Sequence, residues 1–256
     1  MPTNYARFLV GRDRTVKANR QLGWILAFVA GAINAGGFLA VQQYTSHVTG
    51  IVSAVADNLA LGQLGLVVDG IIAVLTFMLG AMCSAILVNF ARRKAMASEY
   101  ALPLLLESVL ILCFGLLGAR MAAYEGLLVP FTVVLLCFIM GLQNAVVTKL
   151  SGSVIRTTHM TGVVTDLGIE LGKLVYWNTD RNSPNFVRAD RERMMVLGLL
   201  FLAFLLGGVS GAFGFKQFGY GFTIPIAVLL AIISVVPAWD DIRRSARTPS
   251  TSNSAD

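Results

Sequence analysis

Long apolar stretches alternate with short polar segments along the 256 residues of the chain. A helix needs about 20 apolar residues to cross the hydrocarbon core of a bilayer. Stretches that approach this length predict six transmembrane helices: 22–41, 66–90, 101–118, 127–147, 194–215 and 220–239. Two further stretches, 50–61 and 162–176, are too short and predict half-helices, either re-entrant or interfacial. The pattern predicts an all-α, polytopic helical membrane protein.

The composition agrees with this fold class and excludes others. Charged residues make up 13% of the chain, whereas an ordinary soluble domain carries about 25%. A soluble nucleic-acid binder is therefore excluded despite the net charge of +6. A disulfide-stapled secreted domain is excluded too, because Cys83, Cys113 and Cys137 are odd in number and lie in apolar runs. We expect these cysteines to be buried apolar residues rather than redox groups or metal ligands.

The basic residues indicate which helix ends face the cytoplasm, since cytoplasmic loops carry an excess of Lys and Arg. If the basic segment 1–21 is cytoplasmic, 18 of the 20 Lys and Arg residues lie on that side, and only Arg120 and Lys216 do not. With six spans, both termini are then cytoplasmic. The end of the chain, 245–256, has the composition of a disordered tail.

An internal repeat links the two halves of the chain. The segment 31–35 (Gly-Ala-Ile-Asn-Ala) recurs at 141–145 as Gly-Leu-Gln-Asn-Ala. The segment 47–50 (His-Val-Thr-Gly) recurs at 159–162 as His-Met-Thr-Gly, and these copies hold the only two histidines of the chain. Chance is a poor explanation for two motifs that recur in the same order.

The two repeat units, 22–118 and 127–239, each contain three predicted spans and one half-helix. Because three is odd, the second unit enters the membrane from the opposite side, which predicts a 3+3 inverted repeat. Many secondary transporters are inverted repeats with interrupted helices, and their sites lie between the halves. Other inverted-repeat membrane proteins transport nothing, so this link to transport is an association.

The residues of the second copy also resemble those of a known family. The stretch 156–168 (Arg-Thr-Thr-His-Met-Thr-Gly-Val-Val-Thr-Asp-Leu-Gly) and the preceding Gly-Leu-Gln-Asn at 141–144 resemble the YoaK family of bacterial integral membrane proteins. The resemblance covers about residues 22–239. It implies a membrane fold in the bacterial inner membrane and no particular substrate. One departure is Ile51, where members carry Asn after the first Thr-Gly.

The two Thr-Gly pairs are the first candidate site residues. Thr49-Gly50 and Thr161-Gly162 each begin a predicted half-helix. Thr is a competent N-cap, Gly permits a sharp turn, and the free N–H groups of a helix start attract anions. These residues either bind a ligand or only satisfy backbone groups in a dry place.

Asn34, Asn144, His47 and His159 occupy matching repeat positions. The two amides either hold helices together or bond the opposing broken helix and line a site. The two histidines either make a structural hydrogen bond near the helix start or contact a ligand or proton. Their spacing matches no metal-binding motif, and we expect no metal or cofactor.

Acidic residues in apolar stretches are the candidate groups for ion or proton coupling, because a charge at membrane depth is costly. They are Asp57, Glu107 and Asp166, of which Glu107 lies within an otherwise apolar run. Asp166, Glu170 and Lys173 share one helix face, so Glu170 and Lys173 either pair at the surface or belong to a site.

The leading hypothesis is a small secondary transporter or permease for a small polar or anionic solute. The alternative is a non-transporting membrane scaffold or small-molecule sensor. We do not expect an enzyme, because the chain lacks a phosphate-binding loop and a Gly-x-Ser-x-Gly elbow. The expected partners are the lipid bilayer and the solute, without nucleic acid. Gly207 and Gly211 form a small-residue face that serves either helix packing or a homo-oligomer.

Overall fold

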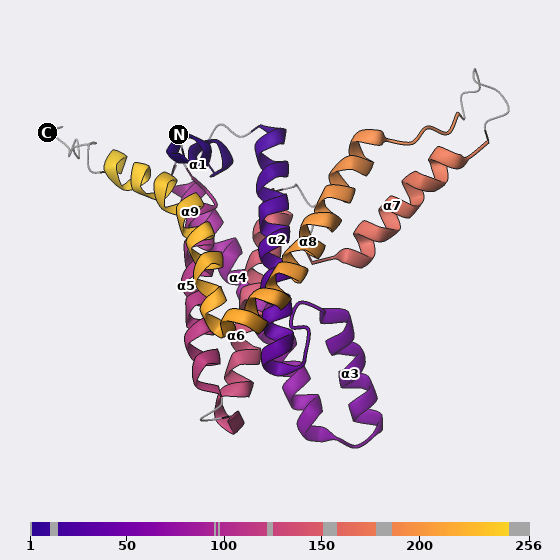
Figure 1. The fold of residues 1–256 in the computed structure, drawn as a ribbon, viewed down its shortest axis with the longest axis vertical. Coiled ribbons are helices and arrows are strands. Elements are labelled where there is room, and N and C mark those ends of the chain that lie inside the picture. The colour runs from indigo at the N-terminus through magenta and orange to yellow at the C-terminus, as the bar shows by residue number, and fades with distance from the viewer. Residues whose placement is uncertain are drawn as a thin grey trace, which may run out of the picture.

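In the computed structural model, the chain is described over residues 2–10, 15–94, 96, 98–121, 125–150, 158–177 and 186–245. These residues form helices joined by turns and short extended segments, without a β-strand (Figure 1). The helices are α1 (Pro2–Val10), α2 (Val16–Val41), α3 (Val48–Ala60), α4 (Leu64–Arg93), α5 (Ala101–Arg120), α6 (Glu125–Leu150), α7 (Met160–Val175), α8 (Arg191–Phe218), the 3₁₀ helix η2 (Gly219–Phe222) and α9 (Thr223–Ser245).

Five helical stretches of the described chain are long and apolar enough to cross a membrane. The fifth, Arg191–Trp239, is 49 residues long and contains both α8 and α9. The two helices meet in a V (Figure 1). The helix breaks at Gly219, whose φ of 59° is readily adopted only by glycine. The predicted all-helical, membrane-like fold is thus confirmed, and the predicted spans 194–215 and 220–239 lie in this fifth stretch.

The short stretches form the short helices α3 and α7, of 13 and 16 residues. At 1.5 Å per residue, each is shorter than the hydrocarbon core of about 30 Å. No residue of α3 is buried. α3 forms a hairpin with α4, and α7 forms one with α8, and both hairpins extend from the bundle (Figure 1).

The N-terminal segment is more structured than its polar composition indicates. Leu9 and Val10 of α1 are fully buried, and α1 packs against α9. Thr15 then caps α2 by accepting a hydrogen bond from the backbone N–H of Ala18 at 3.1 Å. The apolar cluster at the end of α1 is too short to register as a predicted element. Apart from Ser245 at the end of α9, the predicted disordered tail lies outside the described residues.

The α4–α6 pair crosses so closely that backbone meets backbone. A Cβ atom at Gly141 would lie less than 3.0 Å from the carbonyl oxygen of Phe77 on α4. In return, a Cβ atom at Gly80 would lie less than 3.0 Å from the carbonyl oxygen of Phe138 on α6. Real Cβ atoms do not approach this closely, so only glycine fits at both positions.

The α2–α8 pair crosses in the same way. A Cβ atom at Gly31 would overlap the carbonyl oxygen of Phe204, and one at Gly207 would overlap that of Phe28. Gly211 packs equally closely on the backbone of α2 at Ala32. The small-residue face of α8 is therefore used for packing within the chain.

The α4–α6 crossing predicts that replacing glycine by alanine destabilises the protein far more at Gly141 than at Gly198, although both lie in long helices. We expect Gly141→Ala to destabilise the protein by about 1–3 kcal/mol, because the added methyl group must displace the α4 backbone. Gly198→Ala is the control, since nothing lies within 4 Å of a Cβ atom there. Thermal unfolding of the purified protein in detergent compares the two. Equal changes in Tm would contradict a backbone contact at Gly141.

Candidate functional site

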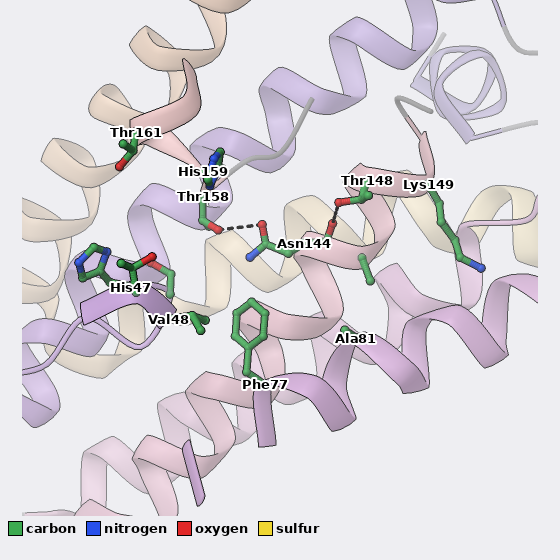
Figure 2. Close-up of a pocket in the computed structure, with 13 residues that line it drawn as sticks. His47, Val48, Phe77, Ala81, Asn144, Thr148, Lys149, Thr158, His159 and Thr161 are labelled. Carbon is green, nitrogen blue, oxygen red and sulfur yellow. Dashed lines mark hydrogen bonds between the residues drawn. The ribbon is translucent and has the colours of Figure 1, made fainter. Parts of the chain in front are cut away.

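The starts of both short helices line one cavity of about 640 Å³ (Figure 2). Its other walls come from α4 and α6. The described lining residues are Ser46, His47, Val48, Thr49, Phe77, Ala81, Asn144, Ala145, Thr148, Lys149, Thr158, His159 and Thr161. Two segments that are more than 100 residues apart in the chain thus meet at one site.

The residues at the helix starts differ from the prediction in one respect. His47 and His159 occupy the N-cap positions of α3 and α7, and Thr49 and Thr161 lie inside the first turn. The prediction of threonine N-caps was wrong, because the histidine carbonyls accept the first helical hydrogen bonds. Ile51 donates to His47 and Val163 donates to His159, both at 3.1 Å. Neither histidine side chain caps its helix.

Each of the two histidine side chains packs against the glycine three residues further along the chain. A Cβ atom at Gly50 would lie less than 3.0 Å from Cδ2 and Nε2 of His47. A Cβ atom at Gly162 would lie equally close to the same two atoms of His159. Each glycine therefore leaves the space that its histidine ring occupies. This requirement explains why glycine follows each histidine at the same spacing.

An asparagine holds the residue before each histidine. The hydroxyl of Ser46 donates to Oδ1 of Asn34 at 2.8 Å. The hydroxyl of Thr158 donates to Oδ1 of Asn144 at 2.7 Å (Figure 2). Each asparagine thus bonds the segment that leads into the short helix of its own half of the chain, rather than the opposing short helix. Asn144 lines the cavity as well, whereas Asn34 does not.

The α6 wall ends in a basic residue. Thr148 donates to the carbonyl of Asn144 at 2.7 Å, and Lys149 lies in the last turn of α6. The Lys149 ammonium donates to Oδ1 of Asn89 at 3.2 Å and to the carbonyl of Ala85 at 3.4 Å, both on α4. Figure 2 shows Lys149 and His47 at opposite ends of the cavity.

The three candidate coupling acids lie outside this cavity and in different environments. Glu107 on α5 is fully buried, and neither carboxyl oxygen has a hydrogen-bond partner among the described residues. Asp57 is exposed on α3. Asp166 on α7 forms an ion pair with Arg193 on α8 at 2.9 Å. Of the three acids, Glu107 is therefore the one that is buried without a hydrogen-bond partner among the described residues.

Glu170 belongs to the same α7–α8 contact as Asp166. Lys173 donates to Oε1 of Glu170 at 2.8 Å, and the backbone N–H of Asp190 donates to Oε2 at 2.8 Å. Two hydrogen bonds lower the pKa of the Glu170 carboxyl. The bond from Lys173 has the larger effect, and the bond from the backbone of Asp190 has the next largest. The Glu170–Lys173 pair thus lies within α7, and the hydrogen bond from Asp190, the N-cap of α8, ties Glu170 to the start of α8.

The comparison with known families places most of this chain in one of them. The family described as "Protein of unknown function (DUF1275)" matches residues 22–236. The chain belongs to this family. The match runs from within α2 to within α9, so it covers both short helices and all the described residues that line the cavity. No curated protein and no solved structure matches the chain.

The repeat in the sequence predicted some of the residues at the cavity of this family member but not all of them. Of the predicted site residues, the cavity is lined by His47, Thr49, Asn144, His159 and Thr161. Gly50 and Gly162 lie against the histidine rings. Ser46, Thr158 and Lys149 were missed. The first two directly precede the repeated histidines, and that position was the available signal.

The described residues do not group three or more His, Cys, Asp or Glu side chains as a metal site would require. The cavity instead offers two histidines, an amide and several hydroxyl groups. Such groups form hydrogen bonds with a small polar molecule.

The packing of His159 on Gly162 predicts an energetic coupling. Gly162→Ala must push the imidazole out of its place, so we expect it to destabilise the protein. In a His159→Ala background the same change should cost little. Unfolding of the four variants in a double-mutant cycle should give a coupling of about 0.5–3 kcal/mol. Additive effects would contradict the contact.

Proposed function

We propose that this protein is a secondary transporter or permease for a small polar or anionic solute, rather than an enzyme. The solute binds in the cavity between the starts of α3 and α7. The observation that carries the proposal is that both short helices begin at one cavity. Free backbone N–H groups at a helix start hydrogen-bond polar and anionic groups, most strongly at membrane depth.

The proposal includes a 3+3 inverted repeat, and corresponding contacts support it. The glycines of the two close crossings correspond in pairs: Gly31 with Gly141, 110 residues apart, and Gly80 with Gly207, 127 residues apart. The phenylalanine carbonyls that they contact correspond with the same two offsets. The asparagine–hydroxyl bonds of 2.8 and 2.7 Å are a further matching pair. Six membrane spans follow if α8 and α9 each cross once.

We also propose where the protein lies in the cell and how it is oriented in the membrane. We assign the family to the YoaK group of bacterial inner-membrane proteins, on the resemblance of residues 141–144 and 156–168. Helix α1 and the C-terminal end of α9 lie toward the same end of the molecule, as an even number of spans requires (Figure 1). The distribution of Lys and Arg favours a cytoplasmic position for both termini.

We assign proton coupling to Glu107. Burying an ionised carboxylate without hydrogen bonds or a counter-charge is costly, so the protonated acid is the form expected in this structure. A conformational change that admits water or a cation to Glu107 would release the proton. Asp166 is the weaker candidate, because Arg193 already compensates its charge.

Residues at the start of α7 should decide whether a solute binds. We expect at least one member of a panel of small carboxylates, phosphate, amides and polyols to raise the Tm of the purified protein, since a ligand of the folded state stabilises it. His159→Ala and Thr161→Val should abolish this shift. Thr165→Val is the matched control, because Thr165 lies one turn further along α7 and outside the cavity.

The same solute should cross the bilayer of proteoliposomes that contain the wild-type protein. Binding without flux would instead support a small-molecule sensor. If no solute binds and no solute or proton gradient changes, the transport proposal is wrong. A shift that survives both substitutions would mean that the site lies elsewhere.

Glu107→Gln should separate coupling from binding. The amide keeps the shape of the side chain but cannot release a proton. We expect this variant to keep the solute-dependent rise in Tm and to lose the acceleration of uptake by an imposed pH gradient. Uptake into proteoliposomes with and without the gradient measures this difference. Asp166→Asn should respond to the gradient like the wild type, and an equal response of Glu107→Gln would rule out its coupling role.

A further inference from the structure

The charged side chains among the described lining residues of the cavity are of one sign, positive. Its described lining residues include Lys149 but no Asp or Glu. The remaining polar groups are hydroxyls, one amide and two imidazoles, and none of these can be negative at neutral pH. The starts of α3 and α7 add the positive ends of two helix dipoles near the histidines. The side chains of the described lining residues are therefore positive or neutral.

The charge of Lys149 is not offset by a carboxylate of its own. Within the described part of the chain, its hydrogen-bond acceptors Asn89 Oδ1 and the carbonyl of Ala85 are both neutral. None of the ion pairs in the described part of the chain includes Lys149. The nearby charges of Arg92 and Glu99 pair with each other at 2.7 Å. Lys149 thus contributes a net positive charge at its end of the cavity.

The packing shared by the two halves does not require a lysine at this position. Lys149 corresponds to Leu39 at the spacing of 110 residues that relates Asn34 to Asn144. Leu39 lies near the end of α2 and is 47% exposed. The cavity reaches α6 at Ala145, Thr148 and Lys149, and it does not reach the corresponding part of α2. Of the two corresponding helices, α2 and α6, only the one that lines the cavity therefore carries the basic residue at this position.

We propose that this cavity selects anions and that Lys149 is the residue that determines the selection. The inference rests on the proposed function and narrows its solute to the anionic class. Apolar walls focus the field of a single charge into the cavity, which raises the local concentration of anions and their rate of binding. Lys149 acts at one end, and the two helix starts receive the anion at the other.

A cysteine at position 145 reports the charge selectivity without knowledge of the solute. Ala145→Cys is introduced after Cys83, Cys113 and Cys137 are replaced by serine. The purified protein is treated with anionic sulfonatoethyl methanethiosulfonate or cationic trimethylammonioethyl methanethiosulfonate. Each reagent forms a mixed disulfide with the thiol and releases methanesulfinate. The ratio of the two rates is divided by the ratio measured with 2-mercaptoethanol.

We expect the normalised ratio to favour the anionic reagent by ~10-fold, within the range of electrostatic focusing. Lys149→Leu should remove most of this preference, and Lys149→Arg should retain it. Lys216→Leu removes the same charge from an exposed position on α8 and should change nothing. Asn89→Leu removes an acceptor of the Lys149 ammonium and should also retain the preference. If Lys149 only ties α6 to α4, Asn89→Leu and Lys149→Leu should act alike.

The outcomes separate this inference from the proposed function. A ratio near one in the wild type, or a ratio that Lys149→Leu leaves unchanged, overturns anion selection while solute flux can still be measured. A preference that depends on Lys149 without any flux supports anion selection and contradicts transport. If neither reagent reacts at position 145, the cavity is closed to water and both proposals fail. Thermal unfolding of each variant confirms that it is folded.

Discussion

The close contact between glycine and backbone carbonyl at two helix crossings is the constraint on which the remaining structure depends. At Gly141 and Gly31 a side chain of any size would force α4 away from α6, or α8 away from α2. Because lipid offers no hydrophobic force between helices, packing of this closeness is a main source of their association. α2 and α6 are also joined directly, since Gln143 donates to the carbonyl of Leu26 at 2.9 Å. The resulting frame holds the cavity walls formed by α4 and α6.

The short helices extend this frame toward the site. Each begins at a histidine N-cap, and the asparagine of the preceding long helix bonds the residue just before that histidine. Glycine then allows the imidazole to lie against the first turn. Each half of the site is thus built from local contacts, and the packing of α6 on both α2 and α4 brings the two halves together. Under the proposed inverted repeat, the first long helix of each unit crosses the second long helix of the other: α2 crosses α8, and α6 crosses α4. Neither unit therefore forms the site alone.

The long apolar helices and both short helices could be predicted because the length of an apolar stretch is read directly from the sequence. His47 and His159 could be placed at the site because their motif recurs. Other features depended on three-dimensional contacts that periodicity does not record. Asp166 pairs with Arg193, 27 residues further along. Lys149 counted only as a marker of the cytoplasmic side, because its position in the cavity follows from where α6 ends.

Anomalous diffraction from crystals grown in bromide would show where the protein binds an anion, since the position of bromide can be identified without ambiguity. We expect bromide inside the cavity lined by the starts of α3 and α7 and by Lys149. The same peak should be absent from crystals of Lys149→Leu. Bromide only at exposed basic residues, or two short helices that begin at separate places, would contradict this expectation.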